Sequence, residues 1–380
     1  MVTTLTADRL ATMQDDGEEF ALVDTRDEES YEAWHVPEAI HFPFSSTDDL
    51  DGRLAELEDL VGDRDRLVTI CGKGISSGAL AARLGQATEE FEVATVEGGM
   101  EAWSRVYHRV PVDVGEGCTV VQVQRRAKGC LGYLIADPDA GEAVVVDPTD
   151  DTDEFVLAAG ECGLEIEAVI DTHVHADHVS GGKKLADSLE VPYYMGEHAS
   201  DRDVERAFEP LADGDVLEIG DLEIETLYTP GHTSDMITPV VSGYAALTAD
   251  TLHAASTGRT ELEFSEDEGE RGARLLYQSL QETILELPDD LAVLPGHVEV
   301  SADGEFGTAR PGDPVVTTIA DARAEIDALS LDEEAFVDRM SEAGEKPANY
   351  EEIIEINRGV REPDPETRDE LEMGPNNCSA

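Results

Sequence analysis

The stretch Thr172–His178, with the sequence Thr-His-Val-His-Ala-Asp-His, follows a short apolar run and decides how the second half of the chain folds. His173 and His175 stand two residues apart at the end of an extended run, so their side chains project to the same side. Asp177 and His178 come where the chain turns toward a helix. Four ligand-type side chains within six residues, on a loop after a buried strand, predict a metal site rather than an ordinary surface loop.

Three later segments each add one ligand-type residue. His232 follows a Pro-Gly turn, Asp250 comes after an apolar stretch that begins at Tyr244, and His297 follows a second Pro-Gly turn. Each segment alone is ordinary, but their order after Thr172–His178 is specific. In this order they resemble the metallo-β-lactamase superfamily over roughly residues 117–300. The resemblance implies an α+β fold, an αββα sandwich that seats metal ions on loops at one edge.

This resemblance leaves two kinds of chemistry open, because one fold serves many reactions. Hydrolytic members hold two metal ions, here expected to be two Zn²⁺, which share a hydroxide that attacks an ester or thioester. The matching residues are His173, His175 and His232 at the first ion, Asp177, His178 and His297 at the second, and Asp250 as the bridge.

Persulfide dioxygenases of the same superfamily hold one Fe²⁺ instead, with two histidines and one carboxylate, and leave positions for O2 and substrate. The matching ligands here are His173, His232 and Asp250, with the other four ligand-type residues around them. Ala176 and the segment 258–261 resemble this branch, whereas glyoxalase-II-like thioesterases usually carry a bulky aromatic residue at the position of Ala176. The resemblance therefore favours the dioxygenase, with Fe²⁺ as cofactor.

Three further positions matter to the comparison with this branch. By resemblance, Arg259 binds a carboxylate of the thiol substrate, a role that suits a guanidinium group. The alternative for Arg259 is a salt bridge to one of the acids nearby, Glu261, Glu263 or Glu266. The family's usual glycine before the metal aspartate is Ala249 here, and Glu299 stands where an aromatic residue is common.

The chain before about residue 112 alternates short apolar runs with helical stretches. We expect strands at 20–24, 67–71 and 92–96 and helices at 28–33, 76–86 and 100–106. Such alternation is typical of an α/β fold, a parallel sheet with helices on both faces. In the second unit we expect strands at 118–124, 132–136, 143–147 and 168–172 and a helix at 153–162.

The boundary between the units falls near 111–117, where the apolar periodicity stops. We therefore place the first domain at 1–112, a linker at 113–117 and the second domain at 118–360. Residues 361–380 are polar and acidic, and we expect a frayed tail there.

Cys71 begins a glycine-rich loop directly after an expected strand. Such a loop turns the backbone N–H groups of a helix N-terminus toward the thiol, which stabilises a thiolate and a bound persulfide. With the strand and Arg26 before it, the His35-x-Pro37 turn and Trp103 after a Gly-Gly turn, this order resembles the rhodanese fold over about residues 5–112. The resemblance makes Cys71 the persulfide carrier. Its loop residues are Gly72, Lys73, Gly74, Ile75 and Ser76.

The alternative for this domain is an inactive, rhodanese-like binding module in which Cys71 is only a small buried side chain. Ser76 stands where active rhodaneses often carry an arginine, whereas Lys73 would add positive charge to the loop. The glycine-rich loop favours a reactive thiol. For Cys118, Cys130, Cys162 and Cys378 we expect no function, and His253 has no recognisable partner in the sequence.

The composition is strongly acidic, with 86 Asp and Glu against 26 Lys and Arg and a formal net charge of -60. An acid excess in both halves is typical of a protein from a salt-rich, halophilic cytosol. It argues against nucleic acid as a partner, since phosphate contacts need clustered basic residues. The sequence predicts neither a membrane segment nor a signal peptide, and five scattered cysteines indicate a reducing, cytoplasmic location.

The sequence therefore predicts a cytoplasmic fusion of a rhodanese-like sulfurtransferase and an iron-dependent persulfide dioxygenase. The expected partners are a low-molecular-weight thiol persulfide, O2, and sulfite or thiosulfate. The identity of the thiol, the direction of sulfur transfer and the choice between monomer and homodimer stay open. The alternative is a dinuclear zinc thioesterase joined to a binding module.

Overall fold

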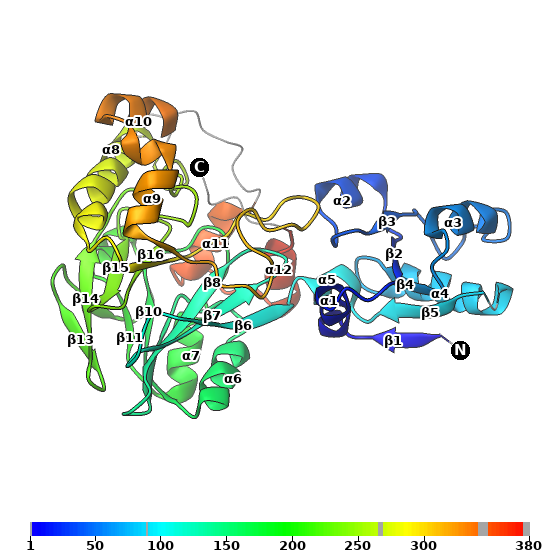
Figure 1. Ribbon diagram of the computed structural model, residues 1–380, viewed down its shortest axis with the longest axis horizontal. Helices are drawn as coiled ribbons and strands as arrows, with labels where there is room; N and C mark the ends of the chain where they lie inside the picture. The colour runs from blue at the N-terminus through cyan, green and yellow to red at the C-terminus, as the bar shows by residue number, and fades with distance from the viewer. Residues whose placement is uncertain (1, 89, 265–268, 341–348, 375–380) are drawn as a thin grey trace.

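The computed structural model of the chain describes residues 2–88, 90–264, 269–340 and 349–374. Figure 1 shows a smaller N-terminal unit beside a larger sandwich, with helix α12 (Pro365–Leu371) where the two units meet. Among the described residues, no helix combines the length and the apolar character that a bilayer crossing requires.

The N-terminal unit is built on a five-stranded parallel sheet with the order β1-β5-β4-β2-β3. Its strands are β1 (Thr3–Leu5), β2 (Ala21–Asp24), β3 (Ile40–His41), β4 (Arg66–Ile70) and β5 (Glu92–Val96). Its helices are α1 (Ala7–Asp15), α2 (Glu28–Ala33), α3 (Leu54–Val61), α4 (Ile75–Ala87) and α5 (Gly99–Trp103).

Both faces of this sheet are covered, which is why its central strands are mostly apolar. All four residues of β2 are buried, as are the last four of β4. One apolar cluster joins the sheet to Leu10 of α1 and Trp103 of α5, and another joins it to Leu57 of α3 and Leu80 of α4. The predicted α/β fold is confirmed, and the expected strand and helix positions agree with the observed ones to within a few residues.

Two mixed sheets form the second unit. The first has the order β12-β11-β10-β9-β8-β7-β6 and the second the order β13-β14-β15-β16-β17-β18. The strands of the first sheet are β6 (Tyr107–Val112), β7 (Thr119–Arg125), β8 (Leu131–Asp137), β9 (Glu142–Val146), β10 (Glu165–Asp171), β11 (Tyr193–Gly196) and β12 (Glu209–Leu211). Those of the second are β13 (Val216–Ile219), β14 (Leu222–Tyr228), β15 (Ile237–Val241), β16 (Ala245–Ala249), β17 (Ala292–Pro295) and β18 (Thr317–Thr318).

Helices cover the outer face of each sheet. They are α6 (Asp153–Cys162) and α7 (Gly182–Leu189) on the first sheet, α8 (Gly269–Gln278), α9 (Ile319–Glu325) and α10 (Glu333–Met340) on the second, and α11 (Tyr350–Asn357), which follows them in the chain. The inner faces share one apolar core, to which Ile135 and Ile170 contribute from one sheet and Leu247 and Leu294 from the other. The predicted αββα sandwich is confirmed (Figure 1).

The domain boundary differs from the predicted one. We placed 107–112 in the first domain, but β6 pairs with β7 along its whole length and is the edge strand of the first sandwich sheet. Residues 113–117 are therefore the turn of a hairpin inside the second unit rather than a linker. An edge strand has the same alternation of apolar and polar residues whichever sheet it joins. The sequence alone therefore did not reveal that β6 pairs with β7.

The predicted frayed tail is also wrong for the residues that the structure describes. Helix α12 lies within it, begins at an Asp364 side-chain cap, and ends beside Leu371 and Glu372, both of which are buried. Residues 375–380 of the predicted tail, including Cys378, lie outside the described part of the chain.

Candidate metal centre

The loop between β10 and α7 brings four ligand-type side chains together at the carboxyl end of a buried strand. His173, His175, Asp177 and His178 are each at most 3% exposed. The ring centroids of His173 and His175 lie 4.1 Å apart, as expected for side chains that leave an extended segment on the same side. The loop therefore places ligand-type atoms in the buried interior rather than on the surface.

The second sandwich sheet supplies the other three candidate ligands. His232 follows β14, Asp250 follows β16 and His297 follows β17, and all three are buried. Strands β16 and β17 run parallel and adjacent, so the residues just after them meet at one edge of the sheet. The structure thus gathers all seven sequence-predicted ligand residues between the two sheets.

The backbone around Asp250 is tightly constrained. Ala249 has a φ of 43°, a left-handed conformation that costs a residue with a Cβ roughly 1–2 kcal/mol. This explains why glycine is usual there in the family that the sequence resembles. At Gly258, a Cβ atom would lie 1.7 Å from the Asp250 carbonyl oxygen. A glycine is therefore required for this segment to pass so close to the ligand.

Several ligand-type atoms in this pocket have no hydrogen-bond partner although they are buried. They are His173 Nε2, His175 Nδ1, His178 Nε2, His232 Nε2 and Asp250 Oδ2. An unsatisfied buried polar atom costs about 1–3 kcal/mol, so five of them in one pocket need an explanation. A metal ion explains them, because each is an atom type that donates a lone pair to a metal. The residues present therefore fit the metal that the resemblance implies.

Three of these atoms form one group. His173, His232 and Asp250 each offer an atom within 4.8 Å of the other two. Asp250 Oδ2 lies 3.4 Å from His232 Nε2 and 3.7 Å from His173 Nε2. Two ligands that are each about 2.1 Å from one ion lie about 3.0–3.4 Å apart at angles between 90° and the tetrahedral angle. The three atoms are thus spaced almost as ligands of a single ion.

A second group lies beside the first. Cys130, Asp177, His178 and His297 each offer a ligand atom within 4.8 Å of the others, and all are buried. Asp177 Oδ2 lies 2.7 Å from His297 Nε2 and 3.0 Å from His178 Nδ1. The nitrogen His297 Nδ1 in turn lies 2.5 Å from Asp250 Oδ1, which connects the two groups.

Hydrogen bonds on the far side of the rings decide which nitrogen faces the pocket. His232 Nδ1 donates to the Arg259 carbonyl oxygen at 2.7 Å, so its Nε2 keeps a lone pair for a metal. His175 Nε2 lies 3.2 Å from Asp147 Oδ1, which leaves its Nδ1 toward the pocket. Metal-binding histidines are usually oriented by such outer partners.

The electrostatics of the first group favour the protonation states that a metal needs. Burial and the neighbouring His175 hold the pKa of His173 well below its usual value. Burial likewise lowers the pKa of His232. Burial alone would raise the pKa of Asp250, but the neighbouring His297 and His232 outweigh it and hold that pKa well below its usual range. Neutral imidazoles and an ionised carboxylate are the ligand forms of these residues.

In the N-terminal unit, Cys71 directly follows β4 and is 3% exposed. The hydroxyl of Ser77 donates to its sulfur at 3.3 Å, and the Ser76 hydroxyl lies 3.1 Å from Thr25 Oγ1. Burial alone would raise the pKa of the Cys71 thiol, but hydrogen bonds from Ser76 and Ser77 outweigh it and lower this pKa below its usual value. The loop thus stabilises a thiolate although Ser76 replaces the arginine common in active rhodaneses.

Lys73 of this loop differs from our expectation of added positive charge. Its ammonium group lies 3.2 Å from Glu366 of α12 and 3.9 Å from both Glu101 and Glu370. Three carboxylates around one ammonium group leave no excess positive charge for the thiolate. Lys73 instead links the loop to α12.

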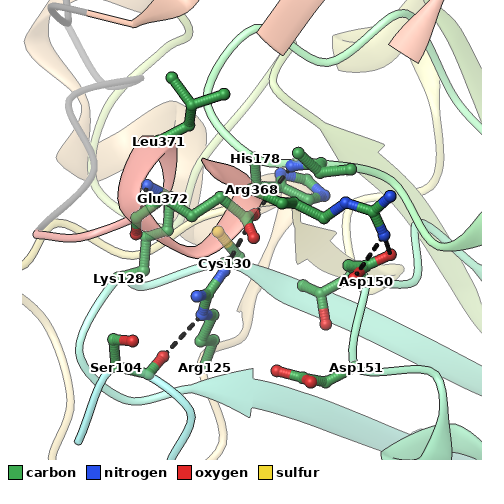
Figure 2. Close-up of polar contacts among 12 residues, drawn as sticks. Ser104, Arg125, Lys128, Cys130, Asp150, Asp151, His178, Arg368, Leu371 and Glu372 are labelled. Carbon is green, nitrogen blue, oxygen red and sulfur yellow. Dashed lines mark hydrogen bonds and ion pairs between the residues drawn. The ribbon is translucent and has the colours of Figure 1, made fainter. Parts of the chain in front are cut away.

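Helix α12 contacts both units at once. On one side Glu366 meets Lys73, and on the other Glu372 reaches the loop that carries the metal ligands. The Glu372 carboxylate accepts from the Val179 N–H at 2.8 Å and pairs with the Arg125 guanidinium at 3.0 Å, and all three groups are buried. Figure 2 shows Arg125, Glu372 and Cys130 gathered beneath the end of this helix. Val179 directly follows His178, so α12 holds the ligand loop in place.

The sequence analysis missed several residues of this site. His253 Nε2 lies 3.1 Å from Asp250 Oδ1, and the three-residue spacing between these two is the only sequence signal for it. The Asn357 side chain of α11 donates to the carbonyl oxygens of His175 and His178. No local pattern marks Asn357, Glu372 or Cys130, since each reaches the site only through tertiary packing.

Comparison with known families agrees with this organisation. Residues 6–106 match the model of the rhodanese-like domain, and residues 125–297 match the model of the metallo-beta-lactamase superfamily. The chain spans only about half the length of some curated relatives. Its match to the Beta-lactamase hydrolase-like protein of Xylella fastidiosa (strain 9a5c), for example, is 30% identical and covers 44% of each chain.

Two shorter relatives are matched over most of their length. The chain is 31% identical to the mitochondrial Persulfide dioxygenase ETHE1 of Bos taurus, over 50% of this chain and 72% of that one. It is also 31% identical to the cytoplasmic Hydroxyacylglutathione hydrolase of Arabidopsis thaliana, over 63% of this chain and 86% of that one. Among solved structures, ETHE1 from Myxococcus xanthus is similar with a TM-score of 0.54 and 27% identity, over 63% of this chain and 97% of that one.

Proposed function

This chain belongs to the metallo-β-lactamase superfamily and carries an N-terminal rhodanese-like domain, and from this premise we propose that it is an iron-dependent persulfide dioxygenase coupled to sulfur transfer at Cys71. The substrate would be the persulfide of a low-molecular-weight thiol. In the balanced reaction, R–S–SH, O2 and H2O give R–SH and sulfurous acid, which ionises to sulfite.

The observation that carries this proposal is the three-residue group of His173, His232 and Asp250. Two histidines and one carboxylate on one side of an ion are the ligand set of non-haem iron oxygenases. His175, the third histidine of a dinuclear hydrolase, is not in this group but lies with Asp147 and Asp171. The three-residue group thus supports iron held by two histidines and one carboxylate, whereas the pocket-facing His175 Nδ1 is the nitrogen that a dinuclear hydrolase would use.

Fe²⁺ bound by these residues would supply the positions at which O2 and the persulfide sulfur meet. The residues themselves do three things. His173 and His232 present neutral imidazoles, Asp250 supplies one negative charge, and their burial keeps bulk water from the reacting sulfur. His232 stays in place because its Nδ1 is anchored to the Arg259 carbonyl oxygen.

Sulfur transfer at Cys71 needs only the thiolate. Its sulfur attacks the outer sulfur of a persulfide or of thiosulfate, the existing S–S bond breaks, and the thiol or sulfite leaves with the electron pair. Hydrogen bonds from Ser76 and Ser77 stabilise the attacking thiolate. Covalent linkage to the second domain raises the effective concentration of one site's product at the other.

The second candidate function is a dinuclear zinc thioesterase. It is favoured by the group that contains Asp177, His178 and His297 beside the first group, and by the match to the Arabidopsis hydrolase. The two candidates are separated by assaying one preparation, isolated without oxygen and loaded with iron, for oxygen uptake with a persulfide and for thioester hydrolysis. Uptake without hydrolysis supports the dioxygenase, and the reverse result supports the thioesterase.

Replacing Arg259 with alanine is expected to raise KM for the persulfide about 10- to 100-fold, with kcat changed far less and iron content unchanged. The reason is loss of one charge-assisted contact to a substrate carboxylate. In the structure the Arg259 guanidinium pairs with Glu261, whose Oε1 lies 2.7 Å from Arg259 Nε, and both residues are buried. Steady-state oxygen-uptake kinetics and iron analysis measure these quantities.

The pair with Glu261 requires a matched control, because alanine at Arg259 leaves a buried carboxylate without this partner and can destabilise the fold by several kcal/mol. The double variant Arg259→Ala/Glu261→Gln removes that charge as well. If the double variant recovers the parent Tm and still has the raised KM, Arg259 binds substrate. A normal KM with a lowered Tm in Arg259→Ala would assign the residue to the structural pair alone.

Stability is expected to rise as KCl increases from millimolar to molar concentration. With 86 acidic and 26 basic residues, most carboxylates have no basic side chain to pair with. Salt screens the repulsion among these carboxylates and also weakens the surface ion pairs, but the repulsion is the larger of the two effects. Thermal unfolding across a KCl series measures the effect. A Tm that stays flat across this range would contradict the proposed halophilic origin of the charge.

A further inference from the structure

The charge beside Cys71 is negative although its loop contains a lysine. Three carboxylates surround the Lys73 ammonium group, at 3.2 Å for Glu366 and at 3.9 Å for both Glu101 and Glu370. One ammonium group against three carboxylates leaves two net negative charges on these four residues, which we call the Lys73 cluster. All four side chains are at least 35% exposed, so a substrate that approaches the loop from solvent meets this charge.

Arg26, at the end of the neighbouring strand β2, is also compensated. It follows Thr25, whose Oγ1 lies 3.1 Å from Ser76 Oγ in the loop. The Arg26 guanidinium pairs with Asp24 at 2.6 Å, and Asp24 is fully buried. The same guanidinium donates to the Trp34 carbonyl oxygen at 2.7 Å. Arg26 is therefore held by internal partners, and together with Asp24 it adds no net charge to the loop.

Short-range dipoles stabilise the Cys71 thiolate without a net positive charge. The Ser77 hydroxyl donates to the sulfur at 3.3 Å, and helix α4 begins at Ile75 in the same loop. A helix N-terminus has the effect of roughly half an elementary positive charge, which is less than the two net negative charges of the Lys73 cluster. The loop therefore suits one negative charge on the sulfur itself, but it repels a substrate that brings two more.

The solvent side of the loop also presents an apolar surface. Ile75 is 77% exposed, the highest value among the large apolar side chains that the structure describes. Contact between this side chain and an organic group removes apolar surface from water, whereas a sulfonate group gains nothing from such a contact. Charge and surface thus favour the same kind of substrate.

We propose that Cys71 takes its sulfur from the persulfide of an organic thiol in preference to thiosulfate, and that Glu366 and Glu370 of α12, with Glu101, determine this preference. The thiolate attacks the outer sulfur of R–S–SH, the S–S bond breaks, and the thiolate R–S⁻ leaves with the electron pair. With thiosulfate the leaving group is sulfite, a dianion that forms beside the Lys73 cluster. Thiosulfate then remains a donor, but a slow one. This inference rests on the proposed sulfur transfer at Cys71 and narrows its substrate class.

The second unit supplies most of this selectivity. Helix α12 lies outside residues 6–106, which match the rhodanese-like model, yet it contributes two of the three carboxylates. The helix is fixed independently of Lys73, because Arg368 pairs with Asp150 at 2.8 Å and Glu372 with Arg125 at 3.0 Å (Figure 2). Neutral side chains in place of Glu366 and Glu370 should therefore leave α12 in position.

The test uses the full chain without oxygen, so that the second domain does not oxidise any persulfide. The measured quantity is the second-order rate constant for forming a persulfide on Cys71, followed by alkylation and mass spectrometry. Thiosulfate is compared with methanethiosulfonate, which presents the same kind of S–S bond with one negative charge fewer, and with the persulfide of 2-mercaptoethanol. As KCl increases from low concentration, the constant for thiosulfate should rise relative to the other two, because salt screens the repulsion.

The double variant Glu366→Gln/Glu370→Gln removes two negative charges from the cluster. It should raise the rate constant about ten-fold for thiosulfate at low salt and about three-fold for methanethiosulfonate, because the repulsion scales with the charge of the donor. Glu334→Gln/Asp338→Asn is the matched control, since it removes two exposed acids from α10. In this control the ratio of the two constants should equal that of the parent.

Two results would overturn the inference. One is a rate constant for thiosulfate that falls relative to methanethiosulfonate as KCl rises, which would mean that the loop attracts the dianion; this comparison needs the parent chain alone. The other is a folded double variant whose ratio stays at the parent value. In both cases a persulfide still forms on Cys71, and the proposed function survives. Absence of a persulfide on Cys71 with every donor would overturn the proposed sulfur transfer and this inference with it.

Discussion

Alanine in place of His173, His232 or Asp250 is expected to remove the iron and to abolish oxygen uptake together. Each of these residues supplies one of only three protein ligands, so any single loss leaves two. Outer partners of metal ligands already contribute roughly 10- to 100-fold in affinity or activity, and a direct ligand contributes more. Protein isolated without oxygen should carry about one iron per chain in the parent and none detectable in the variants, as measured by elemental analysis beside an oxygen electrode.

The partly exposed histidine His198 offers a matched control, because its only described polar partner is Asp201 and it lies outside both ligand groups. His198→Ala should keep both the iron and the oxygen uptake of the parent. Iron that persists in His173→Ala would show that the ligand set is different. Thioester hydrolysis that disappears in His178→Ala and His297→Ala would instead support the dinuclear hydrolase.

The sandwich was predicted from the resemblance that the ligand motifs carry, whereas local patterns indicated where ligand-type residues follow strands. Several apolar strands are followed closely by a histidine or an aspartate, the residue types that bind metals. Because β16 and β17 are parallel neighbours, the residues that follow them meet at the same edge of the sheet. The boundary between the units was placed too late because β6 has the alternation of any edge strand, and only its pairing with β7 assigns it to the second unit.

The sequence could not reveal how the ligands divide into two groups. The histidine and aspartate pattern fits both one iron and two zinc ions. Contacts between side chains that meet only in the folded protein determine how the ligands are grouped. His175 binds Asp147 through Nε2 and keeps Nδ1 toward the pocket, and Cys130 reaches the second group through its bridge with His297. Glu372, from a region predicted to be frayed, meets Arg125, which lies 247 residues away in the chain, and no local pattern encodes this contact.

Replacing Cys71 with serine is expected to abolish sulfur transfer from thiosulfate while the oxygen uptake on preformed persulfide stays close to that of the parent. A serine hydroxyl stays protonated near neutral pH and cannot form a stable persulfide, so transfer should fall to the uncatalysed rate. The second domain keeps its ligands, since Cys71 belongs to none of the candidate metal groups found among the described residues. Sulfite release from thiosulfate with an acceptor thiol, measured beside oxygen uptake, separates the two activities.

Ser77→Ala tests the proposed cause of this reactivity without removing the thiol. Ser77 donates to the sulfur at 3.3 Å, and hydrogen bonds to a thiolate favour the charged form, so their loss should raise the pKa of Cys71. The alkaline-rising limb of the pH–rate profile for sulfur transfer should therefore move to higher pH, while Cys162→Ser, at an exposed cysteine, should leave it in place. Sulfur transfer that continues unchanged in Cys71→Ser would show that this loop does not carry the nucleophile, and the first domain would then be a binding module.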